Sequence, residues 1–217
     1  MIISWYQYAQ LFCLVVACLS YSGLKHFALL AFLPLLIITN SVEMVGENCR
    51  AFGWQNNYWV YNVYLVLTTP LYQLLYNNML ALRGQARSIY WLISVLLVLF
   101  VLLNFFFVQG ISRFNTISLV LIMLFHIIIS CLVLFRLSLQ EMREINLLQE
   151  PYFWINAVTL LFSLITLVIL SLQPFIYANR IEINHKRLYE AIMPAANVVL
   201  YLGYSYAFWL CQWKRIK

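Results

Sequence analysis

Charged residues interrupt this sequence only at long intervals, and the stretches between them limit what the chain can fold into. The stretches without Asp, Glu, Lys or Arg cover residues 1–24, 26–42, 51–82, 88–112, 114–135, 151–179 and 191–213. About 20 apolar residues in an α-helix cross the hydrocarbon core of a bilayer. Most of these stretches are long enough, and 26–42 can continue through Glu43 to about Gly46.

The composition indicates that the solvent of these stretches is lipid. Hydrophobic residues make up 65% of the chain and charged residues 9%, whereas a soluble domain carries roughly a quarter charged residues. Buried strands are the alternative, but the stretches are too long, are rich in Leu and lack the period-2 alternation of a barrel. We therefore predict an all-α fold, because helices satisfy their backbone internally in lipid.

We predict a single transmembrane domain over residues 1–217, a polytopic bundle of seven helices. Pro151 precedes the sixth span and Pro174 closes it, while Glu43 makes the second span the weakest. The spans are expected near 4–22, 24–46, 58–80, 89–109, 115–137, 152–174 and 190–212. Three prolines lie inside spans, where we expect kinks: Pro34, Pro70 and Pro194.

The distribution of Lys and Arg predicts the N-terminus outside and the C-terminus in the cytoplasm. With this orientation the inner segments hold Lys25, Arg83, Arg87, Arg136, Arg143, Lys214, Arg215 and Lys217. The outer segments hold Arg50, Arg113, Arg180, Lys186 and Arg187. Eight basic residues against five favour this arrangement in a cell inner membrane (plasma membrane).

Several classes of function are excluded or made less plausible by what the sequence lacks. It contains no Asp, so mechanisms that need an aspartate are excluded. The basic residues are scattered between apolar runs, which suits anionic lipid headgroups and not nucleic acid. The five cysteines form no CxxC pair and the three histidines lie at different depths, so we expect no metal site and no cofactor. No catalytic motif appears, and we name no catalytic residue.

Polar residues inside the spans gather toward the predicted outer side, and they are our candidate ligand-binding residues. They are Asn40, Glu43, Tyr61, Asn62, Asn104, Glu190, Asn197 and Tyr201. We expect them to line a cavity open to the outside. The alternative is that they form hydrogen bonds between helices, each contributing roughly 1 kcal/mol.

Glu43 is the most informative single residue, because it is the only carboxylate well inside a predicted span. A role as a proton relay or a counter-ion for a ligand fits such a position. The alternative is an interfacial Glu at a helix end, since Gly46 and Glu47 follow.

The third predicted span has a polar face of its own. Thr69, Gln73 and Asn77 follow Asn62 at intervals of seven, four and four residues, which places all four on one side of a helix. With Pro70 in its middle, this face could line a path through the bundle. The alternative is a packed polar seam between helices.

Four short motifs together resemble an uncharacterised family of bacterial seven-helix membrane proteins. They are Leu33-Pro34-Leu35, Asn57-x-Trp59-x-Tyr61-Asn62, Pro151-x-Phe153-Trp154-Ile155 and Asn197-x-x-x-Tyr201. Some members of that family are associated with sensor kinases, so the resemblance implies a seven-helix bundle and a sensory role. Membrane lipid hydrolases of the lysoplasmalogenase type also have many short-looped helices, but they look dependent on aspartates, which this chain lacks.

Three functions are compatible with these features. The function we favour is a receptor-like or accessory signalling protein. Such a protein would bind a small molecule or lipid in the outer cavity and act on a partner protein at the cytoplasmic face. A small-solute transporter or channel is second, supported by the proline-containing spans. A membrane-embedded lipid-modifying enzyme is third, and Glu43, His126 and Glu190 would have to carry its chemistry.

Overall fold

The structure, a computed structural model, describes residues 3–141, 146–178, 182–183 and 186–216. Its α-helices are α1 (Trp5–Leu19), α2 (Tyr21–His26), α3 (Phe32–Glu47), α4 (Tyr58–Leu80), α5 (Gly84–Leu103), α6 (Thr116–Glu141), α7 (Pro151–Ala178) and α8 (Leu188–Ile216). Shorter elements are the 3-10 turns η1 (Cys49–Phe52) and η3 (Leu147–Gln149), the π-helical segment η2 (Asn104–Val108), and the antiparallel strands β1 (Glu182–Ile183) and β2 (Lys186–Arg187). The prediction of a helical fold is confirmed for these residues.

Four segments of the described chain are long and apolar enough to cross a membrane. They are Gly84–Val108, Thr116–Leu139, Pro151–Leu172 and Ala191–Ile216. They indicate a multi-pass membrane protein in a lipid bilayer. α1 and α3 are shorter, with 15 and 16 residues, and α4 is long but carries many polar residues. The count of seven spans stays a prediction.

The helix predicted at 24–46 is divided in the structure. α2 ends at His26 and α3 begins at Phe32, and between them Ala28 adopts a left-handed conformation with φ 54°. The backbone N–H of Leu29 donates to the carbonyl of Leu24 at 2.8 Å, which closes the turn. One positive-φ residue is enough to redirect a helix.

The prolines also act differently from the prediction. Pro34 is the third residue of α3, a position whose N–H has no helical partner, so it starts the helix instead of kinking it. Pro70 and Pro194 do lie inside α4 and α8. α7 continues past Pro174 to Ala178, since a proline removes one backbone hydrogen bond without always ending a helix.

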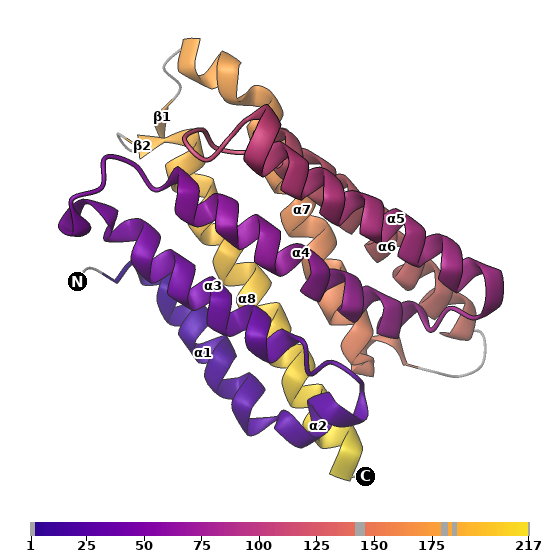
Figure 1. Ribbon diagram of the computed structural model, residues 1–217. Helices are drawn as coiled ribbons and strands as arrows, with labels where there is room; N and C mark the ends of the chain where they lie inside the picture. Colours follow the sequence, from indigo (N-terminus) through magenta and orange to yellow (C-terminus); the bar gives the residue numbers. More distant parts are fainter. Residues whose placement is uncertain (1–2, 142–145, 179–181, 184–185, 217) are drawn as a thin grey trace.

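The long helices pack side by side in a bundle (Figure 1). α1 contacts α3 and α8, α3 also contacts α4, and α4 contacts α5 and α6. α6 packs along α7, and α7 along α8. The group of α1, α3 and α8 therefore lies at one side of the bundle and the pair of α5 and α6 at the other, with α4 and α7 between them.

Aromatic rings fill the centre of the bundle. Phe32 of α3 packs edge-on against Tyr204 and Phe208 of α8, with ring centroids 5.1 Å apart in both pairs. Tyr76 of α4 and His126 of α6 meet at 5.6 Å. Large rings at such contacts contribute packing beyond simple burial, and they fix the spacing of the helices around the polar groups described below.

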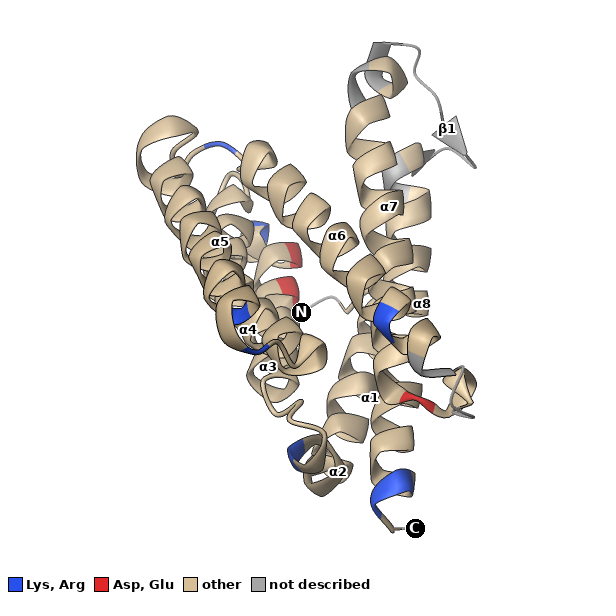
Figure 2. Cartoon of the chain, turned by 90° about the vertical axis from the view of Figure 1, so that its right-hand side faces the viewer, with Lys and Arg blue, Asp and Glu red and all other residues tan. Residues whose placement is uncertain are grey.

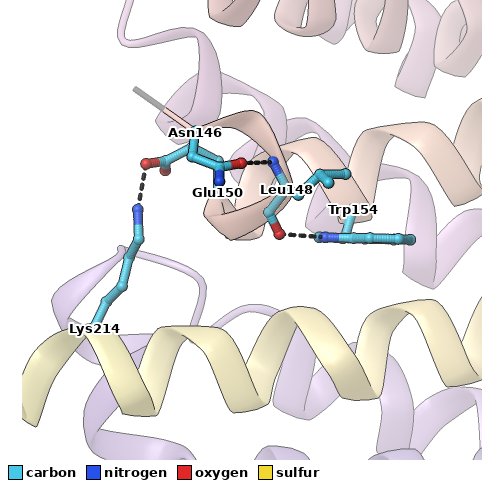
Figure 3. A network of polar contacts seen from close by, with 5 residues as sticks. All are labelled: Asn146, Leu148, Glu150, Trp154 and Lys214. Carbon is cyan, nitrogen blue, oxygen red and sulfur yellow. Dashed lines mark hydrogen bonds and ion pairs between the residues drawn. The ribbon is translucent and has the colours of Figure 1, made fainter. Parts of the chain in front are cut away.

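Residues with charged side chains lie mostly at or near helix ends (Figure 2). One of the ends is held by an ion pair between Lys214 of α8 and Glu150, which precedes α7. The neighbouring indole of Trp154 donates to the carbonyl of Leu148 at 2.9 Å (Figure 3). The start of α7 and the end of α8 are thus joined at the same end of the bundle.

Candidate functional site

Two carboxylates and two tyrosines from three helices meet at one end of the bundle, and we call this group the acid site. Glu43 and Glu47 are one turn apart on α3. The Tyr6 hydroxyl of α1 lies 3.0 Å from Glu43 Oε2 and 2.6 Å from Glu47 Oε1. The Tyr61 hydroxyl of α4 donates to Glu43 Oε2 at 3.1 Å. Ser4 adds a hydroxyl that donates to Glu47.

Local sequence explains how α1 reaches this site. Ser4 caps α1, and its backbone N–H donates to Gln7 Oε1 at 3.0 Å in a capping box. The cap fixes the first turn of the helix, which carries Tyr6. The Ser4 hydroxyl then bonds Glu47, so that one residue starts α1 and holds it against α3.

The position of Tyr61 depends on Gly46. A Cβ atom at Gly46 would lie 3.0 Å from the Tyr61 hydroxyl oxygen and 3.1 Å from its Cζ, so the glycine allows the ring to approach α3 closely. Asn57, at the start of α4, donates its side-chain amide to the Gly46 carbonyl at 3.2 Å. Both contacts hold the ends of α3 and α4 together around Glu43.

The acid site has more acceptors than donors. A tyrosine has one hydroxyl hydrogen, so Tyr6 can donate to only one of the two carboxylates at a time. In the part of the chain that the structure describes, the ion pair that forms is Lys214–Glu150, and no Lys or Arg pairs with Glu43 or Glu47. Two half-buried carboxylates without a cation carry negative charge that a bound proton or cation would offset.

α1 carries two buried carboxamide side chains, Gln7 and Gln10, in the turns that follow Tyr6. Gln7 is 2% exposed and Gln10 is fully buried. Neither amide nitrogen has a hydrogen-bond partner among the described residues, and neither does the amide oxygen of Gln10. Buried polar atoms are usually paired, so two neighbouring carboxamides with unpaired atoms are an exception in this part of the described chain.

The structure brings some of the predicted ligand-binding residues together. Glu43 and Tyr61 are in direct contact, and Tyr201 of α8 is buried in the core. Asn40 and Asn197 instead donate to carbonyls of their own helices, Leu36 and Met193, at 2.8 and 3.0 Å. Glu190 belongs to α8, but its side chain lies outside the described residues.

Asn62 and Asn104 form their hydrogen bonds outside the acid site. Asn62 follows Tyr61 on α4, but it donates to the carbonyl of Arg113, in the segment before α6, at 2.7 Å. Asn104 donates to the Ser118 hydroxyl at 2.7 Å. The predicted residues therefore fall into two hydrogen-bonded groups at this end of the bundle, and the cavity open to the outside stays a prediction.

The polar face of α4 packs against its neighbours. Thr69 bonds the carbonyl of Leu65 in its own helix at 2.6 Å. Gln73 donates to the Ser94 carbonyl of α5 at 3.0 Å, and its own carbonyl accepts from the Tyr90 hydroxyl at 2.6 Å. These bonds favour the packed seam over an open path. Asn77 lies further along the face, half-buried, and donates to Asn78 at 3.4 Å.

His126 is buried against aromatic rings. Its ring centroid lies 4.4 Å from that of Tyr72 and 5.6 Å from that of Tyr76. Among the described residues, no group of three or more His, Cys, Asp or Glu side chains could hold a metal ion. The surroundings of His126 are those of a core residue.

Sequence reasoning missed Tyr6, Glu47 and the pair Gln7 and Gln10. Glu47 follows Glu43 by four residues, and this spacing on a helix places both carboxylates on one face. Gln7 and Gln10 precede Cys13 at intervals of three, which marks one face of the first helix. The contact between α1 and α3 could not be predicted, because Tyr6 and Glu43 are 37 residues apart in the sequence.

Comparison of the chain with protein families, with curated proteins and with solved structures finds no match.

Proposed function

We propose that the chain is a receptor-like membrane protein that binds a small, positively charged molecule at the acid site. The observation that supports this is the convergence of Glu43, Glu47, Tyr6 and Tyr61 without a basic partner among the described residues. Paired carboxylates favour a cation, and the tyrosine rings beside them suit an ammonium group. The unpaired amide oxygen of Gln10 adds an acceptor for N–H groups.

The proposal includes seven spanning helices with the N-terminus outside a cell inner membrane (plasma membrane). The acid site then opens toward the outer side, where a solute arrives. Lys25, Arg83, Arg87, Lys214 and Arg215 fall at the inner side and support this orientation. The resemblance to a family associated with sensor kinases supports a partner signalling protein at the inner face.

A transporter is the second candidate function. Pro70 and Pro194 interrupt the backbone hydrogen bonding of α4 and α8, as in transporters whose broken helices move. The packed seam around Gln73 counts against a path along α4. A receptor needs only the outer site, so we rank it first.

The test is the melting temperature of the purified full-length chain in detergent. Butylammonium and tetramethylammonium ions are titrated, with butanol as the uncharged match. We expect a saturable rise for the cations, because a ligand at 100 times its Kd stabilises the folded state by about 2.7 kcal/mol. Butanol should have no such effect.

Variants assign the response to the site. The double variant Glu43→Gln with Glu47→Gln should lose the response to cations. Glu150→Gln removes a carboxylate at the other end of the bundle and should keep it. A cation response that survives in the double variant, or its absence in the wild-type chain, would contradict the proposal.

A further inference from the structure

An open groove lies between α7 and α8, which pack side by side in the bundle (Figure 1). Its volume is about 210 Å³, and every residue that lines it is apolar. The walls include Leu161, Phe162 and Ile165 of α7 and Ile192, Ala195 and Val199 of α8. An apolar cavity of about 150 Å³ is large enough to bind benzene, so the groove has room for a somewhat larger apolar group.

A tight contact between the two helices bounds the groove at one end. Val158 lines the groove, and a Cβ atom at Gly203 would lie 2.4 Å from Val158 Cγ1. Away from this contact, α8 presents Ala195 and Ala196, whose short side chains leave space between the helices. The groove therefore extends from the contact toward the end of the bundle at which β1 and β2 connect α7 to α8.

Both walls of the groove belong to segments that are apolar and long enough to cross a membrane, Pro151–Leu172 and Ala191–Ile216. Leu161 and Val199 are each 47% exposed, so the groove opens to the lipid side of the bundle. The seven residues from Ile192 to Val199 span about 10 Å along α8. This depth fits within the hydrocarbon of one leaflet, which is about 15 Å thick.

The chemistry of the walls restricts what can occupy the groove. A polar solute would lose its hydrogen bonds to water and gain none, because only apolar residues line the space. A helix of another chain is about 10 Å wide and is too large to enter it. Helix contacts in membranes also favour small residues, whereas Leu161, Leu164 and Val199 are exposed on this side of the two helices.

We propose that the groove binds one acyl chain of a phospholipid, taken from the leaflet beside β1 and β2. Lipid tails around the protein are as apolar as the groove, so the preference for the groove comes from closer packing and not from escape from water. The acid site is formed by α1, α3 and α4, and the lipid site by α7 and α8. The proposal therefore does not depend on the proposed function.

Photo-crosslinking of the full-length chain in nanodiscs tests the site. The bilayer is phosphatidylcholine with a trace of phosphatidylcholine that carries a diazirine midway along one acyl chain, and peptide mass spectrometry locates the label. Leu99 of α5 is the reference for ordinary lipid contact, since it is 49% exposed and belongs to another membrane segment. We expect the groove residues to be labelled about tenfold more than Leu99, the preference that roughly ten additional carbon contacts provide. Equal labelling would overturn the proposal.

A groove-filling variant assigns the label to the groove. Ala195 is exposed at the groove, so Ala195→Phe places a ring in the space without enlarging the protein core. Labelling of the groove residues should then fall to the level of Leu99. Leu202→Phe is the matched control, because Leu202 is 49% exposed on the same helix and does not line the groove. Strong labelling that persists in Ala195→Phe would contradict the site.

Native mass spectrometry of the wild-type chain released from the nanodiscs gives a readout that needs no variant. The expected species is one chain with one retained phospholipid. A chain that retains no phospholipid would refute the site. A dimer without lipid would show that a second copy of the chain covers the groove, which would also overturn the proposal. Neither experiment contains the cations that test the acid site, so the two proposals fail separately.

Discussion

The Tyr6 hydroxyl shows how much of the acid site depends on a single atom. It lies within hydrogen-bond distance of both carboxylates and is the contact between α1 and Glu43. The Ser4 hydroxyl donates to Glu47, and the Tyr61 hydroxyl donates to Glu43. Removing this hydroxyl should leave the packing of the ring intact and change the electrostatics of both glutamates.

We expect Tyr6→Phe to lower the free energy of unfolding by about 1.5–3 kcal/mol, the usual contribution of a hydrogen bond to a charged group. Thermal unfolding of the purified chain measures the change. Tyr8→Phe is the matched control, since Tyr8 lies on the same helix but is 61% exposed. Equal stability of the two variants would show that the Tyr6 bonds contribute nothing.

The residues of the site differ in how far sequence could predict them. Glu43 and Tyr61 were predictable, because each stands out as a polar group within or beside an apolar run. The grouping of Asn62 and Asn104 with Glu43 was not borne out by geometry, because a helix has several faces and depth alone does not say which neighbour a side chain meets.

At the scale of elements, α7 and α8 pack tightly against each other at Gly203. A Cβ atom there would lie 2.4 Å from Val158 Cγ1. We expect Gly203→Ala to destabilise the protein by about 1–3 kcal/mol through overpacking. Adding Val158→Ala should recover part of the loss, measured as a favourable coupling in a double-mutant cycle of thermal unfolding.

Gly23→Ala provides the contrast, because its Cβ would lie 2.6 Å from the backbone nitrogen of Gln212, which no side-chain substitution moves. It should destabilise the contact between α2 and α8 without a rescuing partner. If Val158→Ala failed to reduce the cost of Gly203→Ala, the close packing of α7 and α8 at this point would be refuted.

The end of α8 should depend on the ion pair with Glu150. The two side chains are 26% and 17% exposed, so solvent screens the pair and its contribution is at most about 1 kcal/mol. We expect Lys214→Met to speed hydrogen exchange in the last turns of α8 by about twofold to fivefold. Arg215→Met, at the exposed neighbouring residue, should leave exchange unchanged; similar rates in both variants would contradict the role of the pair.

The presence of the helices was easier to predict than the point at which one of them is interrupted. Long uncharged runs indicated every long helix, because lipid requires apolar side chains along its length. The break between α2 and α3 carries no such mark: Ala28 takes its left-handed conformation in a sequence of ordinary helix formers. α2 instead contacts α8, and the Ser22 hydroxyl donates to Gln212 Oε1 at 3.0 Å.

At the scale of the whole molecule, we expect α4 to cross the membrane although it is more polar than the helices that follow it. α5, α6, α7 and α8 contain segments that are apolar and long enough, whereas α4 carries buried polar residues such as Asn62 and Gln73. These side chains are bonded to α5 and to the segment before α6, so neighbouring helices cover the polar face of α4 and leave its apolar side for lipid. A polar helix can span a bilayer in this way, because the cost of a polar group disappears when protein surrounds it.

Cysteine labelling from the two sides of the membrane tests this arrangement. In a background without the native cysteines, Gln55→Cys precedes α4, Gln85→Cys begins α5, and Ser112→Cys follows η2; all three positions are exposed. With the N-terminus outside, an impermeant maleimide should label positions 55 and 112 on intact cells, and position 85 only after permeabilisation. Labelling of 55 and 85 from the same side would mean that α4 does not span. The reverse pattern, with position 85 outside and position 112 inside, would show that the bundle has the opposite orientation. The acid site would then lie at the cytoplasmic face, which would contradict the proposed binding of an external solute.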